Sequence, residues 1–463
     1  MTNSVPSASS SLKVLVVGGS ISGLAAAHAL QQAGHRVTVF EASSGNTISH
    51  GGLRSPPNMT RILNRWGLSP SLEKLGVKCS GLTMLEGVTG EGIASMIFHE
   101  KLIEQLGADF LTLQHGDLWK MLYDLAVQSG VEIQFNTRVL GVNSDSLSLT
   151  LENGDRVSAD VIVGADGPRS IVREYALGGF DEGCPSSGDL TLTFTLPSSA
   201  VEEDEDLRWL AHTSEWPVWL GDGYIAHGCR IHGGNEISVM LCSPNRTSWN
   251  NRFNEDWSDR IPLSELELEQ HKFDPRLWKL LHKAEVFTAS LHRDKPQLES
   301  IVCEYGRVVL VGEAAHPFMT EGQYKAALSV EDAEFLGCLF SRITDISQVP
   351  AFLSGYEESR QGRYEKISEW ERRKRHLLLL PPGPEQQTRD QEWRSASQTT
   401  DWADVDASMT NEVWSSELET FVYDAAEAVE DWWAKWGPIL RGSGEDAGKP
   451  PLEVSVTSRN ARS

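Results

Sequence analysis

The segment near the start of the chain, LKVLVVGGSISGLAAAHALQQAGHRVTVFEAS, constrains the fold most strongly. Its first apolar run, Leu12 to Val17, predicts a buried strand, and the glycine-rich turn that follows leads into an Ala-rich helix. A second strand is predicted from Arg36 to Phe40, ending at Glu41. Strand, turn, helix and strand in this order predict a βαβ unit of a doubly wound α/β domain.

The residues of the turn fit a dinucleotide. Gly18 permits the tight turn, Gly23 lets the helix pack close to the strand, and the helix N-terminus offers unpaired N–H groups to a pyrophosphate. Ser20 replaces the middle glycine of G-x-G-x-x-G; it is small, and its hydroxyl can reach a phosphate. Glu41, 23 positions after Gly18, can accept both ribose hydroxyls of an adenosine. These residues therefore predict dinucleotide binding.

Two later segments also end in polar residues after a buried strand. SADVIVGADGPRSIVREYAL places Asp166 after its strand, and RVVLVGEAAHPF places Glu313 after its own. The segment AALSVEDAEFLGCLF then predicts an amphipathic helix. A simple NAD enzyme needs only the first βαβ unit, so three nucleotide-facing strand ends favour FAD.

With these three motifs the chain resembles the class A, aromatic-hydroxylase-type FAD monooxygenases, and within them the fungal salicylate-hydroxylase-like group. The resemblance extends over essentially the whole chain. It includes four further segments: GGLRSPPNMTRILNRWGL, GRYEKISEWERRK, PPGPEQQTRD and EDWWAKW.

The resemblance implies a chemistry and a set of residues. NADH or NADPH reduces the flavin, O₂ reacts at flavin C4a, and one oxygen atom passes to an electron-rich aromatic ring. Glu41 would hold the adenosine ribose, Asp166 would face the dinucleotide and the transient nicotinamide cofactor, and Glu313 would bind the ribityl chain. The helix starting near Ala326 would point its N-terminus at the flavin N1/C2 carbonyl. The other cofactor-binding residues expected are Gly18, Ser20, Gly23, Arg54 and His115.

The chain departs from its family at several of these positions. Glu313 replaces the usual Asp, and Gln114-His115 replaces His-Arg. Thr320 stands in place of a proline, and Tyr324-Lys325 in place of Gln-Gly. Lys325 either supplies a fixed positive charge near reduced flavin or hinders access to the ring. Two alternatives therefore stay open: an FAD-binding catalyst of a non-redox rearrangement or cyclisation, and a non-catalytic paralogue that binds a small molecule or partner.

The pattern of strands and helices predicts four zones in an α/β fold. A Rossmann-type FAD-binding domain is interrupted by an antiparallel β-sheet substrate domain and is followed by a helical C-terminal extension. The boundaries expected are 1–179 and 293–375 for the two parts of the FAD domain, 180–292 for the sheet and 376–463 for the extension.

Candidate catalytic residues lie on the inserted sheet, in WPVWLGDGYIAHGCRIHGG. His227 or Tyr224 can draw the proton from a phenol and raise the electron density of its ring. Strand alternation puts Trp219 and His227 on opposite faces unless a bulge intervenes. An ordinary structural histidine and core tyrosine are the competing interpretation. His316 is expected to be a scaffold residue of its turn.

Composition excludes several other functions. A net charge of −24 argues against nucleic acid or an anionic membrane as a partner. Six scattered cysteines, no metal-ligand spacing, no apolar run long enough for a membrane span and a leader unlike a signal peptide predict a metal-free, soluble, cytoplasmic enzyme. Its expected ligands are FAD, NAD(P)H, O₂ and a small aromatic or natural-product substrate.

Two features of the C-terminal part have structural interpretations. The charged run ESRQGRYEKISEWERRKR predicts a solvated helix with i,i+4 pairs. The tail tryptophans predict anchors that pack helices on the main body; they are Trp402, Trp414, Trp432, Trp433 and Trp436.

Overall fold

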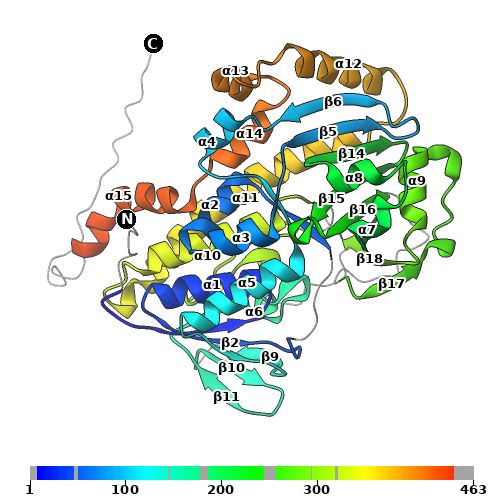
Figure 1. The fold of residues 1–463 in the computed structure, drawn as a ribbon. Helices are drawn as coiled ribbons and strands as arrows, with labels where there is room; N and C mark the ends of the chain where they lie inside the picture. Colours follow the sequence, from blue (N-terminus) through cyan, green and yellow to red (C-terminus); the bar gives the residue numbers. More distant parts are fainter. Residues whose placement is uncertain are drawn as a thin grey trace, which may run out of the picture.

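A computed structural model describes residues 8–45, 51–143, 146–177, 186–243, 257–293, 295–318 and 322–442. The mixed α/β architecture agrees with the predicted fold class (Figure 1). Among the described residues, the chain forms no helix that is both long and apolar enough to cross a bilayer.

A five-stranded parallel sheet forms the centre of the nucleotide-binding half. Its strands follow the order β19-β12-β1-β2-β8. They are β1 (Lys13–Val17), β2 (Arg36–Phe40), β8 (Glu132–Gln134), β12 (Val161–Gly164) and β19 (Val308–Leu310). Val14, Leu15 and Val16 are fully buried, as expected for a strand covered on both faces.

Helices and small sheets surround the parallel sheet. Helix α1 (Ile21–Gln32) lies against α5 (His115–Gln128) and against α10 (Lys325–Phe340), which is buried along nearly its whole length (Figure 1). Helix α6 (Ile171–Leu177) follows β12. Two three-stranded antiparallel sheets complete this half: β9 (Val139–Asn143), β10 (Ser148–Leu151) and β11 (Arg156–Ser158); and β3 (Gly52–Ser55), β7 (Leu111–Gln114) and β4 (Val77–Lys78).

The second half is an eight-stranded sheet in the order β17-β18-β13-β16-β15-β14-β5-β6. Its strands are β5 (Gly81–Glu86), β6 (Gly92–Ile97), β13 (Ser186–Pro197), β14 (Glu215–Gly221), β15 (Tyr224–Ile231), β16 (Glu236–Ser243), β17 (Asp259–Pro262) and β18 (Val286–Arg293). Strands β5 and β6 lie well before residue 180 in the sequence. They join this sheet because β5 pairs in parallel with β14. The sheet therefore takes two strands from outside the segment 180–292.

The two faces of the large sheet have different neighbours. On β14, Trp216 and Val218 pack into the core shared with the nucleotide-binding half, whereas Trp219 packs into a separate outer core. Helices α7 (Ser198–Glu202), α8 (Arg208–His212) and α9 (Pro275–His282) cover that outer core. Alternation along the strand thus separates a site-facing face from a packing face.

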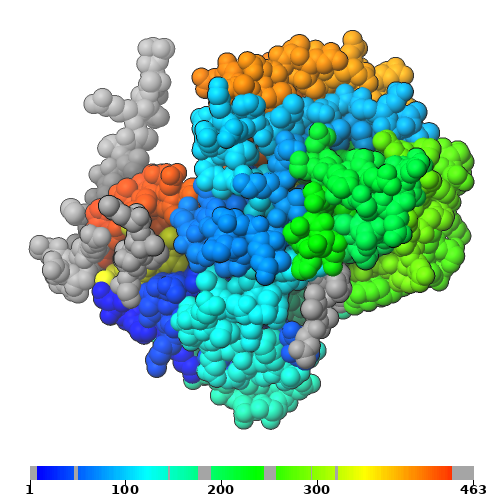
Figure 2. Space-filling model, viewed as in Figure 1, coloured from blue at the N-terminus to red at the C-terminus, as the bar shows by residue number. Residues whose placement is uncertain are grey.

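Helices α2 (Pro57–Arg65), α3 (Ser69–Leu75) and α4 (Glu100–Leu106) complete the first half. The C-terminal helices are α11 (Val349–Leu378), α12 (Pro384–Thr399), α13 (Val405–Thr410), α14 (Ser415–Val422) and α15 (Ala425–Gly442). Figure 2 shows α12 and α13, in orange, lying against the blue surface of β5, β6 and α4. The backbone N–H of Ser95 on β6 donates to the Ser397 hydroxyl on α12 at 2.9 Å, which fixes this contact.

The tail tryptophans anchor these helices. Trp402 and Trp432 are buried, and Trp414 lies between the rings of Trp393 and Trp402. Trp433 is partly buried, with its ring centroid 5.7 Å from that of Phe352 on α11. This confirms the predicted packing role for four of the five, while Trp436 is 46% exposed.

A buried ionic cluster joins α10 to α11. The carboxylate of Glu331 accepts from Arg360 and from Arg363, each at 3.0 Å, and from the amide of Asn58 at 2.7 Å. Asp332 accepts from Arg360 Nε at 2.7 Å. Both carboxylates are fully buried, so their charges depend on these partners.

Candidate cofactor and substrate site

Three adjacent strand ends define the site. Strand β1 lies next to β12, which lies next to β19, and all three run parallel, so their carboxyl ends meet at one edge of the sheet. The backbone N–H of Ala165 donates to the Val17 carbonyl at 2.8 Å, and that of Val311 donates to Gly164 at 2.9 Å. The turns that begin at Gly18, Ala165 and Gly312 are therefore neighbours. In open α/β sheets this edge is where ligands bind.

The glycine turn after β1 needs its glycines. Gly18 has a φ of +102°, and a Cβ there would overlap the carbonyl of Ala165. A Cβ on Gly23 would overlap the carbonyl of Gly18. Ser20 starts helix α1 without a side-chain cap, and its hydroxyl lies 3.4 Å from that of Ser22. The side chain of Ser20 thus leaves the first N–H groups of the helix uncapped.

Glu41 is fixed beside this turn by backbone donors. Its Oε2 accepts from Gly19 N at 2.6 Å and its Oε1 from Ser43 N at 2.7 Å. The indole of Trp119 donates to the Gly19 carbonyl at 2.8 Å and holds the turn from the other side. The carboxylate is therefore preoriented next to the glycine turn, as a ribose acceptor needs to be.

Asp166 shapes the second turn. Its Oδ1 accepts from the Ser170 hydroxyl at 2.5 Å, and its Oδ2 accepts from Ile171 N at 2.8 Å, at the start of α6. Burial raises the pKa of this carboxyl, and the hydrogen bonds oppose the shift. The Asp166 side chain thus accepts a hydrogen bond from the first residue of α6. A contact between Asp166 and the dinucleotide stays a prediction.

Glu313 and Lys325 form an ion pair across the third turn. Lys325 Nζ lies 3.1 Å from Glu313 Oε1. Lys325 is the first residue of α10 and Ala326 lies in the first helical turn, so the cation stands where the helix N-terminus opens. Gly312 N donates to Asp332 at 3.0 Å, which ties this turn to the buried ionic cluster.

Tyr324, the other residue that departs from the family, is turned away from the site. Its ring is buried edge-to-face against Trp370, with centroids 5.4 Å apart, and its hydroxyl bonds that of Thr420 on α14. Glu371 accepts from Tyr324 N at 3.2 Å. Sequence patterns gave no sign of this long-range packing. Thr320 lies outside the described residues.

Three nitrogen-bearing side chains lie on strands β3 and β15 and at the end of β7, and these strands are neighbours. Arg54 on β3 has Nη1 3.2 Å from Nε2 of His227 on β15, and its guanidinium lies 4.7 Å from the ring centre of Trp216. His115 lies at the end of neighbouring strand β7. Burial lowers the pKa of His115, and the charge of Glu313 acts in the opposite direction.

These residues leave three buried nitrogens without a hydrogen-bond partner among the described atoms: Arg54 Nε, His115 Nδ1 and His227 Nδ1. A buried polar group without a partner costs about 1–3 kcal/mol. The three atoms therefore fit a ligand with several acceptors. The carbonyl oxygens and ring nitrogens of a flavin supply them, and the tight glycine turn fits its pyrophosphate.

His227 and Tyr224 face opposite sides of the large sheet. Val218 pairs with His227 and Trp219 with Ala226, so His227 faces the site and Trp219 faces the outer core, as strand alternation predicts. Tyr224 packs with Trp219 in that core, and its hydroxyl donates to the Gly87 carbonyl at 2.8 Å. We therefore do not propose Tyr224 as a catalytic residue.

His316 is a scaffold residue, as its sequence position suggests. Its ring stacks on Tyr364 with centroids 4.7 Å apart, and its Nε2 lies 3.5 Å from Asp332. In the described parts of the chain, no three His, Cys, Asp or Glu side chains are grouped to hold a metal ion.

Comparisons with known proteins agree with this geometry. The family model described as FAD binding domain matches residues 11–371. The chain is 28% identical to FAD-dependent monooxygenase OpS4 of Beauveria bassiana, over 82% of this chain and 88% of the relative. It is 30% identical to hispidin-3-hydroxylase of Neonothopanus nambi, over 77% of this chain and 87% of the relative.

Solved structures share the fold. The structure of HpxO from Klebsiella pneumoniae, complexed with FAD and uric acid, aligns with a TM-score of 0.72 at 22% identity, over 89% of this chain and 97% of that one. A salicylate hydroxylase substrate complex aligns with a TM-score of 0.70 at 20% identity, over 91% of this chain and 98% of that one.

Proposed function

Because the chain belongs to the FAD binding domain family, we propose that it is an FAD-dependent, NAD(P)H-consuming monooxygenase of a small aromatic, phenolic or other natural-product substrate. The observation that carries the proposal is the meeting of three strand ends, at Gly18, Asp166 and Glu313, beside a set of buried, unpartnered nitrogens. When bound, FAD supplies the redox chemistry, taking hydride from the nicotinamide and activating O₂.

The chain's own residues bind and orient the cofactor. The N-terminus of α1 and the turn at Gly18 hold the pyrophosphate, with Ser20 and Gly23 allowing the close approach. Glu41 accepts from the adenosine ribose. The N-terminus of α10 at Ala326, together with Lys325, stabilises negative charge on the reduced ring.

The large sheet closes the site from the other side. Arg54, His115 and His227 would donate hydrogen bonds to the ring or to the substrate from nitrogen atoms that are buried in the described structure. Dry surroundings strengthen each of these interactions. The sheet face that carries Trp216 forms the substrate wall.

Relatives support an aromatic substrate and oxygenation. Hispidin-3-hydroxylase and the 3-hydroxybenzoate 6-hydroxylase 1 of Aquipseudomonas alcaligenes are both named as hydroxylases of aromatic compounds. Their names favour oxygen insertion over the non-redox rearrangement. We place the enzyme in the cytoplasm, with O₂ and a small molecule as its partners.

The direct test is the absorbance spectrum of the purified protein, followed by NAD(P)H oxidation and O₂ uptake with candidate phenols. We expect a yellow protein whose O₂ uptake rises with substrate. Gly18→Ala should lose FAD, because of its positive φ and the overlap with Ala165. Gly92→Ala, which adds a Cβ in open space, is the matched control.

Two results would reject the proposal. A protein that stays colourless even after it has been saturated with FAD would show that the chain does not bind this cofactor. A yellow protein that converts a substrate while consuming neither NAD(P)H nor O₂ would establish the rearrangement instead.

A further inference from the structure

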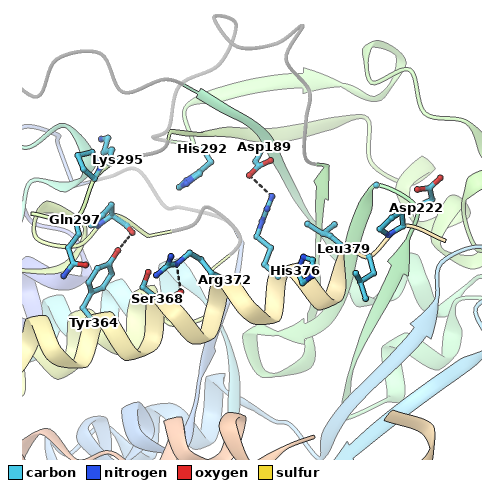
Figure 3. Close-up of a pocket in the computed structure, with 16 residues that line it drawn as sticks. Asp189, Asp222, His292, Lys295, Gln297, Tyr364, Ser368, Arg372, His376 and Leu379 are labelled. Carbon is cyan, nitrogen blue, oxygen red and sulfur yellow. Dashed lines mark hydrogen bonds and ion pairs between the residues drawn. The ribbon is translucent and has the colours of Figure 1, made fainter. Parts of the chain in front are cut away.

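A pocket with a volume of about 1070 Å³ lies between the second half of α11 and the sheet strands β13 and β18 (Figure 3). Pro317, which follows the turn carrying Glu313, lines it, and the hydroxyl of Tyr364 donates to the Pro317 carbonyl at 2.5 Å. The pocket therefore borders the chain segment that leaves the candidate flavin site. Its volume is at the upper end of the range for small-molecule sites, which suits a ligand larger than one aromatic ring.

One face of α11 lines this pocket. Tyr364, Ser368, Arg372 and His376 follow each other at intervals of four residues, and Figure 3 shows them side by side along the helix. The charged run that sequence analysis interpreted as a solvated helix is thus divided between two faces. Arg372 and Arg373 are both exposed, but only Arg372 lines the pocket. The neighbouring lysine, Lys374, pairs with Glu417 on α14.

The pocket's cations have different surroundings. Arg375 pairs with Asp189 on β13 at 2.6 Å and ties the helix to the sheet. Lys295 donates to the carbonyl oxygen of Pro168. Arg372 donates from Nε to the Ser368 carbonyl of its own helix at 3.4 Å, which is a long hydrogen bond to a neutral group. Arg372 is therefore the cation best placed to accept an anionic partner.

The remaining lining is mixed. Pro296, Pro317, Leu379, Leu380 and Pro381 supply apolar walls, and Asp222, His292 and Gln297 supply polar groups. A ligand with an apolar body and one anionic group matches this combination.

We propose that this pocket binds an extended acidic substrate, whose carboxylate or ionised enol pairs with Arg372 and whose apolar body points toward Pro317. The assignment rests on the proposed monooxygenase function and narrows its substrate to acidic compounds larger than a single ring. It also identifies Arg372 as a specificity-determining residue.

The test is calorimetric titration of the FAD-loaded protein with two probes that share one ring system, 1-pyrenebutyrate and 1-pyrenebutanol. Wild type should bind the carboxylate at least tenfold more tightly than the alcohol. Arg372→Gln should reduce that ratio to threefold or less, and Arg372→Lys should restore most of it. Arg373→Gln is the matched control, because it removes the same charge from the adjacent exposed position and should keep the wild-type ratio.

Three outcomes would overturn the assignment. These are equal binding of both probes by wild type, equal ratios in Arg372→Gln and Arg373→Gln, and displacement of pyrenebutyrate by ADP-ribose, which would give the site to the coenzyme. Binding and NAD(P)H oxidation are measured separately, so a wild-type enzyme that binds both probes equally but still oxidises NAD(P)H rejects only the pocket. A retained ratio without any NAD(P)H oxidation rejects only the proposed function.

Discussion

The Nη1 atom of Arg54 lies 3.2 Å from Nε2 of His227, so a guanidinium that can only donate faces a ring nitrogen that has to accept. Burial, reinforced by the charge of Arg54, holds the pKa of His227 well below its ordinary value, so the ring is neutral. Its proton then resides on Nδ1, which has no partner within the described structure. This geometry makes His227 a hydrogen-bond donor to ligand and argues against its predicted role as a base.

We therefore expect His227→Leu to lower kcat by about 100-fold, as for loss of a donor to developing negative charge. His227→Gln, which keeps one donor and one acceptor, should retain more activity. The pH dependence of kcat/KM separates the two roles. A donor gives no ionisation from this residue, whereas a base gives an acidic limb, below pH 6.5 because the pKa of His227 is lowered, and that limb vanishes in His227→Gln.

Lys325 should raise the reduction potential of the bound flavin. Its ammonium stands at the N-terminus of α10 and neutralises Glu313, so Lys325→Met removes a cation and leaves a carboxylate unpaired. We expect the two-electron potential to fall by about 30 mV, corresponding to about 1.4 kcal/mol. Spectroelectrochemical titration against a reference dye measures this. Lys120→Met, on the exposed surface of α5, is the control, and an equal potential in both variants would contradict the assignment.

The buried ionic cluster should control stability. Although burial acts to raise the pKa of Glu331, Arg363 and Arg360 hold it below the ordinary value. Glu331→Gln leaves two buried guanidinium groups undercompensated and should cost about 3–5 kcal/mol in the free energy of unfolding. Lys120→Gln, which breaks an exposed i,i+4 pair, should cost about 0.5 kcal/mol or less. Urea unfolding measures the free energy of unfolding of both variants. Similar decreases in the two would show that the buried cluster is dispensable for stability.

Stability should fall as the pH is lowered from 7 to 5. Burial lowers the pKa of four histidines below 6.5, and that of His28 falls to about 4. Below pH 6.5 these histidines therefore bind protons in the unfolded chain but not in the folded chain. The free energy of unfolding then falls as the pH is lowered, by up to about 1.4 kcal/mol per pH unit for each histidine. The raised pKa values of Asp166 and Glu334 act in the opposite direction.

Chemical denaturation at pH 7.0, 6.0 and 5.0 measures this slope. His28→Gln should flatten it, because a glutamine does not titrate. An unchanged slope in that variant would mean that His28 is protonated in the folded protein.

The nucleotide-binding edge could be predicted because its signals are local. The spacing from Leu12 to Glu41 specifies strand, turn and helix, and each glycine answers a steric demand within a few residues or on the adjacent strand. Strand alternation also placed Trp219 and His227 on opposite faces.

Features set by contacts between distant segments could not be predicted in this way. The pairing of β5 with β14 joins residues about 130 positions apart, and the sequence of neither strand indicates which strand it pairs with. The direction of the Tyr324 side chain depends on Trp370 and Thr420. Likewise, the pairing of Lys325 with Glu313 follows from a turn whose shape only the folded chain shows.

The hydrogen bond between Tyr324 and Thr420 joins the residue just before helix α10 to a segment beyond residue 371, where the family match ends. Chimeras that exchange C-terminal segments between relatives would therefore also exchange the anchor that sets where this helix begins. A swapped tail whose counterpart of α14 does not provide the hydroxyl partner of Tyr324 should first weaken flavin retention, before any change in substrate preference.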